Sequence, residues 1–266
     1  MRQGNEFYVA GDPYTNSGFW GPPTSAVNFC EEDYVVTRYV AEFINTLTNL
    51  AYVYLAIRDA RTPRRGYSSG GKQTGGGSQP PGLDLMSGAL AAVGVTSFIF
   101  HATLKHSTQF ADEVSMLVLA GALLQGVYCA GSSNGRRNGL ITASVVATVV
   151  AMSAYYLQSG NFVVHLVMFS LLIHNVWPRT IYLIYNRTKA GPERSKLFRK
   201  FYTAVAWCLA AFALWNVDIE WCQAVRKLQA ATGLPWSWLL ELHGWWHVMT
   251  GLGAAAYIDL IRDLSV

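Results

Sequence analysis

The sequence contains few charged residues. Of its 266 residues, 14% are Asp, Glu, Lys or Arg, whereas 52% are hydrophobic. Roughly a quarter of the residues in an ordinary soluble domain are charged, so this composition argues against that class and favours a membrane protein. The formal net charge is only +4, and we expect no nucleic-acid partner.

Residues 1–33 lack the two parts of a cleavable signal peptide, a basic n-region and a continuous apolar h-region. They are polar and rich in Gly and Pro. We therefore expect residues 1–33 to form an N-terminal segment, and the first apolar span to act as the signal. The chain also lacks an internal repeat.

Seven apolar stretches follow, each about 20 residues long, which is the length of helix that crosses a bilayer core. They lie near residues 35–57, 84–104, 110–131, 139–158, 161–185, 200–220 and 239–261. The predicted fold is an all-α membrane protein, a seven-transmembrane helix bundle over residues 34–262. Within it, the Gly- and Ser-rich run 66–82 is predicted to be a flexible cytoplasmic loop.

Basic residues are distributed unevenly between the two sets of alternate loops. One set and the tail contain fourteen: Arg58, Arg61, Arg64, Arg65, Lys72, Arg136, Arg137, Arg187, Lys189, Arg194, Lys196, Arg199, Lys200 and Arg262. The opposite set contains Arg2, Arg38, Lys105, Arg226 and Lys227. Because cytoplasmic loops carry the excess of Lys and Arg, we predict a cytoplasmic C-terminus and an N-terminus that is lumenal or outside.

Two of the four cysteines fall on the predicted non-cytoplasmic side. Cys30 lies in the N-terminal segment and Cys222 follows the sixth span. Disulfides persist on that side of a membrane, so we expect a Cys30–Cys222 bridge, with two free thiols as the alternative. Cys129 and Cys208 lie within spans and are expected to be small core residues.

Three histidines lie in apolar spans at a similar predicted depth. His101 is near the outer end of the second span, and His243 and His247 begin the seventh. The last two are four residues apart and share one face of a helix, where they either pack or bind a metal. Three histidines are one ligand set of a catalytic zinc with an open fourth position. We expect the remaining histidines to be hydrogen-bonded or interfacial: His106, His165 and His174.

Two further polar residues lie near His101. Ser97 precedes it by one turn and Asp112 follows it across a short connection. In a lipid hydrolase, Asp112 would act as general base and Ser97 would donate a hydrogen bond to the developing oxyanion. The substrate would be an amide or ester whose tails lie in the membrane. The alternatives are structural, since Ser97 can bond back to its own helix and Asp112 can cap the third span.

Acidic residues cluster in the N-terminal segment. Glu31, Glu32 and Asp33 are consecutive, and Glu42 follows. Closely spaced carboxylates suit calcium, which takes about six to eight oxygen ligands. The spacing is not that of an EF-hand, so by spacing alone a solvated acidic loop is the better interpretation.

Motifs along nearly the whole chain resemble those of the alkaline ceramidase family. They are WGPPTS at 20–25, NFCEEDY at 28–34, AEFINT at 41–46, FHATL at 100–104, WNVD at 215–218 and HGWWH at 243–247. The resemblance implies a seven-span amidohydrolase of the endoplasmic reticulum or Golgi membrane. Such an enzyme acts on a linear amide and cleaves ceramide to a sphingoid base and a free fatty acid.

The resemblance also implies roles for particular residues. The implied ligands of a catalytic zinc are His101, His243 and His247, and the implied catalytic residues are Ser97 and Asp112. The implied ligands of a structural or regulatory calcium are Asn28, Phe29 (through its carbonyl), Glu31, Asp33 and Glu42. The implied disulfide joins Cys30 and Cys222. Asn28 stands where Asp is usual and Asp33 where Asn is usual; the charge is unchanged, so calcium is still expected.

Two other functions fit parts of the pattern. One is a hydrolase that remodels the lipid of GPI anchors and attacks an ester. The other is a non-enzymatic seven-span lipid receptor with a structural zinc. The acidic cluster and the cysteine pair favour the ceramidase. The sequence carries no indication of oligomeric state.

Overall fold

The computed structural model describes residues 14–61 and 83–265, which fold into helices without a β-strand. The predicted loop over 66–82 lies outside the described residues. The elements are η1 (Thr15–Ser17), α1 (Phe43–Thr48), α2 (Leu50–Arg61), α3 (Leu85–Thr103), α4 (His106–Cys129), α5 (Gly135–Ser159), α6 (Phe162–Arg187), α7 (Pro192–Glu220), α8 (Cys222–Thr232), η2 (Trp236–Leu240) and α9 (Leu242–Asp263).

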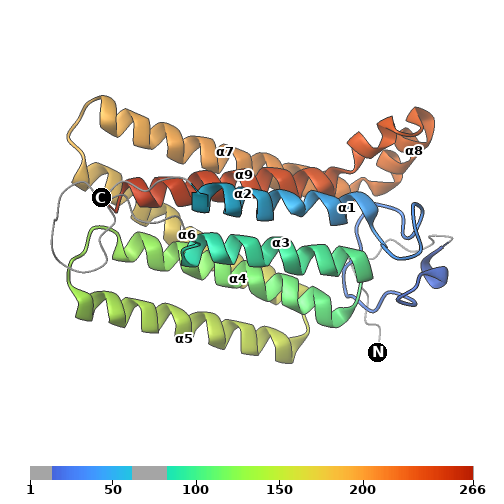
Figure 1. The fold of residues 1–266 in the computed structure, drawn as a ribbon, viewed down its shortest axis with the longest axis horizontal. Coiled ribbons are helices and arrows are strands. Elements are labelled where there is room, and N and C mark those ends of the chain that lie inside the picture. The colour runs from blue at the N-terminus through green and yellow to red at the C-terminus, as the bar shows by residue number, and fades with distance from the viewer. Residues whose placement is uncertain (1–13, 62–82, 266) are drawn as a thin grey trace.

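The long helices run side by side along the longest axis of the molecule (Figure 1). Residues 14–33 of the N-terminal segment and α8 lie at one end of the bundle, and the C-terminal end of α9 lies at the other (Figure 1). Helix α7 packs along α9, α3 along α4, and α2 along α3. At Gly253 the approach is close, since a Cβ atom there would lie 2.8 Å from Cys208 Sγ and 3.2 Å from Ala204 O. Small residues allow such contacts between membrane helices.

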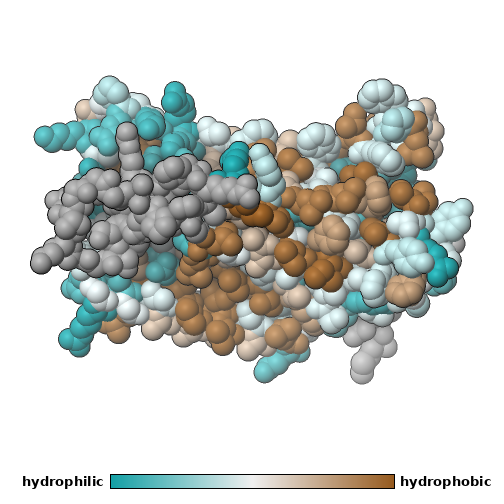
Figure 2. All heavy atoms as spheres, in the orientation of Figure 1, coloured by the Kyte–Doolittle hydropathy of each residue, from teal (hydrophilic) through white to brown (hydrophobic). Residues whose placement is uncertain are grey.

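Five helices are long and apolar enough to cross a membrane: α3, α4, α5, α6 and α7. Hydrophobic side chains gather along the middle of the bundle, and hydrophilic ones gather toward its ends (Figure 2). On α5, Leu140, Val146 and Val150 are exposed, as expected for a surface that faces lipid. The protein is therefore an all-α membrane protein. Helix α9 and the α1–α2 pair are not among the helices that are long and apolar enough to cross a membrane.

Local capping explains where several helices begin. Asp84 accepts a hydrogen bond from Ser87 N (2.8 Å) at the start of α3, and Asn134 accepts one from Arg137 N (3.0 Å) at the start of α5. Gly160 ends α5 with a φ of 61°, and Asn161 then caps α6. Ser, Thr, Asp and Asn are the preferred residues at such caps. The predicted spans from 84–104 onward correspond to α3, α4, α5, α6, α7 and α9.

The prediction for the first span was wrong at its start. Helix begins at Phe43 rather than near residue 35, and it is interrupted at Asn49 between α1 and α2. The Glu31 carboxylate accepts hydrogen bonds from Ile44 N (2.6 Å) and Asn45 N (2.8 Å). A carboxylate is favourable at a helix N-terminus. The start of α1 is therefore determined by a residue of the N-terminal segment and not by the hydropathy of the span.

The predicted disulfide is confirmed. Cys30 and Cys222 are bonded, with their Cα atoms 5.3 Å apart, and the bond joins the N-terminal segment to the start of α8. Cys129 and Cys208 are free and partly buried.

Cys222→Ser is expected to lower the free energy of unfolding by about 2–4 kcal/mol, because the bond closes a long loop of the unfolded chain. The cysteines are 192 residues apart. Thermal unfolding of the purified protein in detergent measures the effect, with Cys129→Ser as the matched control. Equal unfolding temperatures for Cys222→Ser and wild type would show that the bond does not stabilise the fold.

Candidate metal centre

The three predicted zinc ligands meet at one point of the bundle. His101 lies in the last turn of α3, and His243 and His247 lie in the first two turns of α9. One ligand atom of each residue lies within 4.8 Å of the others, and the residues are 1%, 3% and 3% exposed. Within 14–61 and 83–265, no other group of three or more His, Cys, Asp or Glu side chains converges in this way. Buried imidazoles in this arrangement fit zinc with an open fourth position.

Hydrogen bonds orient two of the imidazole rings. Nδ1 of His101 contacts Glu42 Oε2, and Nδ1 of His247 lies 3.0 Å from Thr48 Oγ1. A metal-binding histidine usually engages its second ring nitrogen in this way. Nε2 of each ring is therefore the atom available to a metal.

The third imidazole is oriented by packing. The His243 ring stacks on Phe29, with centroids 3.6 Å apart. Its backbone N–H donates to Asp218 Oδ1 (3.3 Å), and the other oxygen of Asp218 accepts from Cys30 N (3.1 Å). Asp218 is buried in α7. It therefore links the N-terminal segment to the first turn of α9.

Ser97 and Asp112 face the same cavity as the histidines. This central cavity has a volume of about 170 Å³, and both side chains line it. Both are buried, and the Ser97 hydroxyl lies close to the Asp112 carboxylate. Oδ1 of Asp112 has no hydrogen-bond partner in the protein. The alternative in which Asp112 caps the third span is wrong, because α4 begins at His106 and Asp112 lies inside it.

Except for Glu32, which is exposed, the residues of the acidic cluster are buried, so the interpretation of the cluster as a solvated loop is wrong. Asn28, Glu31, Asp33 and Glu42 are all among the buried polar residues. The Asn28 amide donates to both oxygens of Asp33 (3.3 and 3.4 Å), and Phe29 N donates to Glu42 Oε1 (3.2 Å). Burial and the nearby Glu42 carboxylate raise the pKa of Glu31 well above its ordinary value. Buried carboxylates of one sign are stabilised by a cation, and these oxygen donors suit calcium.

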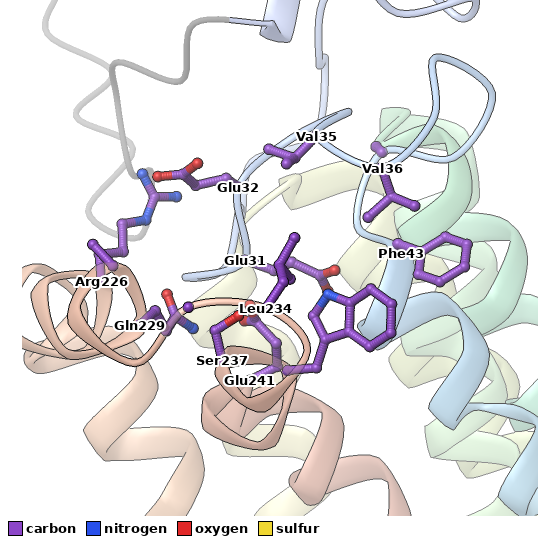
Figure 3. Close-up of a pocket in the computed structure, with 14 residues that line it drawn as sticks. Glu31, Glu32, Val35, Val36, Phe43, Arg226, Gln229, Leu234, Ser237 and Glu241 are labelled. Atoms are coloured by element: carbon purple, nitrogen blue, oxygen red, sulfur yellow. The ribbon is translucent and has the colours of Figure 1, made fainter.

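A surface pocket leads to the acidic cluster from outside the bundle. It has a volume of about 280 Å³ and lies between the N-terminal segment and the α8–η2 turn. In Figure 3, Arg226 and Glu32 lie at one edge of this surface pocket, and Glu31 and Glu241 lie nearer its centre. An ion in solvent therefore has a route to Glu31.

A second, apolar cavity adjoins the central cavity. It has a volume of about 300 Å³, and Tyr52, Met116 and Trp246 line both. Its other walls include Leu119, Leu123 and further aliphatic and aromatic side chains. A hydrocarbon chain fits a space of this character, since binding sites for small molecules are largely lined by apolar groups.

Comparison with known proteins decides the family. The family's sequence model, described as ceramidase, matches residues 21–266. The chain belongs to the ceramidase family. It is 29% identical to Alkaline ceramidase 3 of Mus musculus over 91% of this chain and 84% of the relative. It is 28% identical to Alkaline ceramidase YPC1 of Saccharomyces cerevisiae over 94% and 79%, and 28% identical to Alkaline ceramidase of Arabidopsis thaliana over 87% and 80%.

In this ceramidase-family chain, three supporting residues were missed by the sequence analysis. Asp218 lay within a quoted motif but received no role, although an acidic residue inside an apolar span is a signal in itself. Thr48 gave no signal, because its contact with His247 joins residues 199 apart. His165 was expected to be hydrogen-bonded or interfacial, yet it is buried, lines the central cavity and leaves Nδ1 without a partner.

Proposed function

We propose that this protein is an alkaline ceramidase, which cleaves the amide of ceramide to a sphingoid base and a free fatty acid with the help of zinc. The observation that carries the proposal is the convergence of His101, His243 and His247 beside the Ser97–Asp112 pair. The adjoining apolar cavity gives a hydrocarbon tail a place next to these polar groups. The three relatives named above are all alkaline ceramidases.

The proposed setting is a seven-span bundle in the membrane of the endoplasmic reticulum or Golgi. Residues 1–33 would face the lumen, residues 34–262 would form the transmembrane catalytic domain, and the C-terminus would be cytoplasmic. The uneven distribution of basic residues supports this orientation. The Cys30–Cys222 bond supports it as well, because it lies at the end of the bundle that would face an oxidising compartment.

Zinc at His101, His243 and His247 would supply a Lewis acid and a water of lowered pKa. Asp112 would take a proton from the attacking water and pass it to the amine leaving group. The Ser97 hydroxyl lies close to the Asp112 carboxylate and lines the same cavity. Once Asp112 carries the proton, that hydroxyl is free to turn and donate to the oxyanion on the former amide carbonyl.

Calcium is the proposed ion of the acidic cluster, held by oxygens of Asn28, Phe29, Glu31, Asp33 and Glu42. One carboxylate oxygen of Glu42 accepts a hydrogen bond from Phe29 N in the acidic cluster. The other oxygen contacts Nδ1 of His101, one of the proposed zinc ligands. An ion in the cluster would therefore also fix the carboxylate that orients His101.

Calcium at about one hundred times its dissociation constant is expected to stabilise the protein by about 3 kcal/mol. Thermal unfolding in calcium against a calcium chelator measures this. Asp33→Asn removes one of the buried charges and is expected to abolish most of the shift. Glu32→Gln is the matched control, since Glu32 is exposed beside the cluster. If the unfolding temperature of the wild-type protein is the same with and without calcium, the proposed calcium site is ruled out.

The proposed reaction is tested with purified protein in detergent and two lipids of matched tails, a ceramide and an ester analogue. Mass spectrometry of the products is expected to show sphingoid base and fatty acid in equal amounts from the ceramide. Cleavage of the ester alone would favour the anchor-remodelling function. Binding of both lipids with cleavage of neither would favour the receptor.

A further inference from the structure

His165 is a buried polar residue without a partner in the central cavity. It lies in the first turn of α6 and is 1% exposed, and its Nδ1 has no hydrogen-bond partner in the protein. It lines the central cavity together with Ser97, His101 and Asp112. Leaving a buried donor or acceptor unpaired is costly. A ligand that enters the cavity can supply the missing partner.

Aromatic packing holds the His165 ring in place. It stacks on Phe162 and Phe169, with centroids 6.1 and 6.2 Å away, and it lies 5.5 Å from the Tyr156 ring. Phe162 and Phe169 also line the cavity. The imidazole is therefore a fixed element of the cavity wall, with little freedom to find a partner elsewhere.

The neighbouring carboxylate is already engaged. Glu113 accepts a hydrogen bond from Gln109 Nε2 (2.9 Å) at one oxygen and from the Tyr156 hydroxyl at the other. Gln109 Oε1 in turn accepts from Ala26 N (2.7 Å). This chain of bonds ties α5 and the N-terminal segment to α4. Both oxygens of Glu113 are therefore engaged, whereas Nδ1 of His165 is open to a ligand.

The charge of the cavity selects the kind of group that His165 can bind. Two carboxylates, Asp112 and Glu113, line the central cavity, and its described lining contains no Lys or Arg. Beside His165, a phosphate would therefore meet the like charge of these carboxylates without a Lys or Arg side chain to offset it. A hydroxyl both donates and accepts, so it can pair with Nδ1 in either tautomer of the imidazole.

We propose that His165 is a specificity-determining residue that binds a hydroxyl of the sphingoid base while the amide lies at the three histidines. The inference rests on the proposed function, because it assumes that the substrate is a ceramide. In that substrate the carbon bonded to the amide nitrogen has a hydroxyl-bearing carbon on each side. Either hydroxyl therefore enters the same small cavity as the reacting amide.

The test compares three substrates and four proteins. The substrates are ceramide and two analogues, each lacking one of the hydroxyls adjacent to the amide-bearing carbon. The proteins are wild type, His165→Phe, which keeps a ring without ring nitrogens, His165→Asn, which keeps a polar group near Nδ1, and His106→Phe. His106 is exposed at the start of α4 and outside the cavity, so its variant is the matched control. His165→Leu makes the same comparison if the Phe variant does not fold.

Wild type is expected to prefer ceramide to one of the analogues by at least about tenfold in kcat/KM, because losing the hydroxyl leaves a buried group unpaired. His165→Phe is expected to lose that preference by losing activity on ceramide while cleaving the analogue at the wild-type rate. His165→Asn should retain part of the preference, and His106→Phe all of it. Equal losses on all substrates, or no change on any, would overturn the role of His165.

Binding separates this inference from the proposed function. Trp215 and Trp246 line the central cavity, so their fluorescence reports binding of ceramide and of the analogues without turnover. If wild type binds ceramide selectively through His165 but does not cleave it, the proposed reaction fails and hydroxyl recognition stands. If wild type cleaves ceramide and His165→Phe keeps its preference, hydroxyl recognition fails and the reaction stands.

Discussion

Replacing His247 by alanine is expected to abolish zinc binding and to lower the rate of ceramide hydrolysis by at least about a thousandfold, since a catalytic metal contributes several kcal/mol to the transition state. One of the three converging ligand atoms disappears with the imidazole. Thr48 Oγ1, which lies 3.0 Å from His247 Nδ1, then loses this contact but keeps its hydrogen bonds to the carbonyls of Ile44 and Asn45. Metal analysis and hydrolysis measured on one preparation check both effects.

His106→Ala is the control for the loss of an imidazole. His106 is exposed at the start of α4 and does not line the central cavity, so its variant should keep wild-type zinc content and rate. A His247→Ala protein that keeps both its zinc and its activity would contradict the three-histidine centre. Zinc lost with activity unchanged would mean that the metal is not used in the reaction.

Asp112→Asn is expected to lower kcat by about 10²- to 10⁴-fold, the range for loss of a general acid–base group. The amide has nearly the shape of the carboxylate but cannot take up the proton of the attacking water. Because Asp112 faces the cavity and its Oδ1 has no hydrogen-bond partner in the protein, zinc content and unfolding temperature should change little. Initial rates at saturating ceramide measure the effect.

Asp259→Asn is the matched control for this substitution. Its carboxylate is 54% exposed and pairs with Lys200 near the C-terminal end of α9, far along the helix from His247. It should leave kcat unchanged. Wild-type turnover by Asp112→Asn would exclude Asp112 as the base. If wild type itself binds ceramide without turnover and Asp112→Asn binds it equally well, the lipid receptor is the better account.

The predicted spans that matched helices were those whose signal is local. Long apolar runs and capping residues such as Asp84 and Asn134 lie within the segment that they define, so hydropathy and capping rules locate it. The start of α1 was missed because it depends on Glu31, thirteen residues before Ile44. No periodicity within 35–57 contains that information.

Some residues of the candidate site could likewise be predicted from the sequence, and others could not. His101, His243 and His247 could be brought together from the sequence, because the predicted topology put them at one depth. The disulfide followed from the same argument. Asp218 and His165 acquire their importance only through neighbours from distant segments, Cys30 in one case and the walls of the central cavity in the other. The sequence around a lone histidine in an apolar span does not show whether its hydrogen-bond partner is a neighbouring helix, the lipid interface or a substrate.

The most direct test of a zinc-dependent ceramidase is to follow zinc and activity together in purified wild-type protein. Zinc per chain and the rate of ceramide hydrolysis are measured before chelation, after removal of the metal, and after zinc is returned. We predict about one zinc per chain, loss of hydrolysis with the metal and recovery on its return. Ceramide hydrolysis that continues at the same rate without zinc would contradict the account.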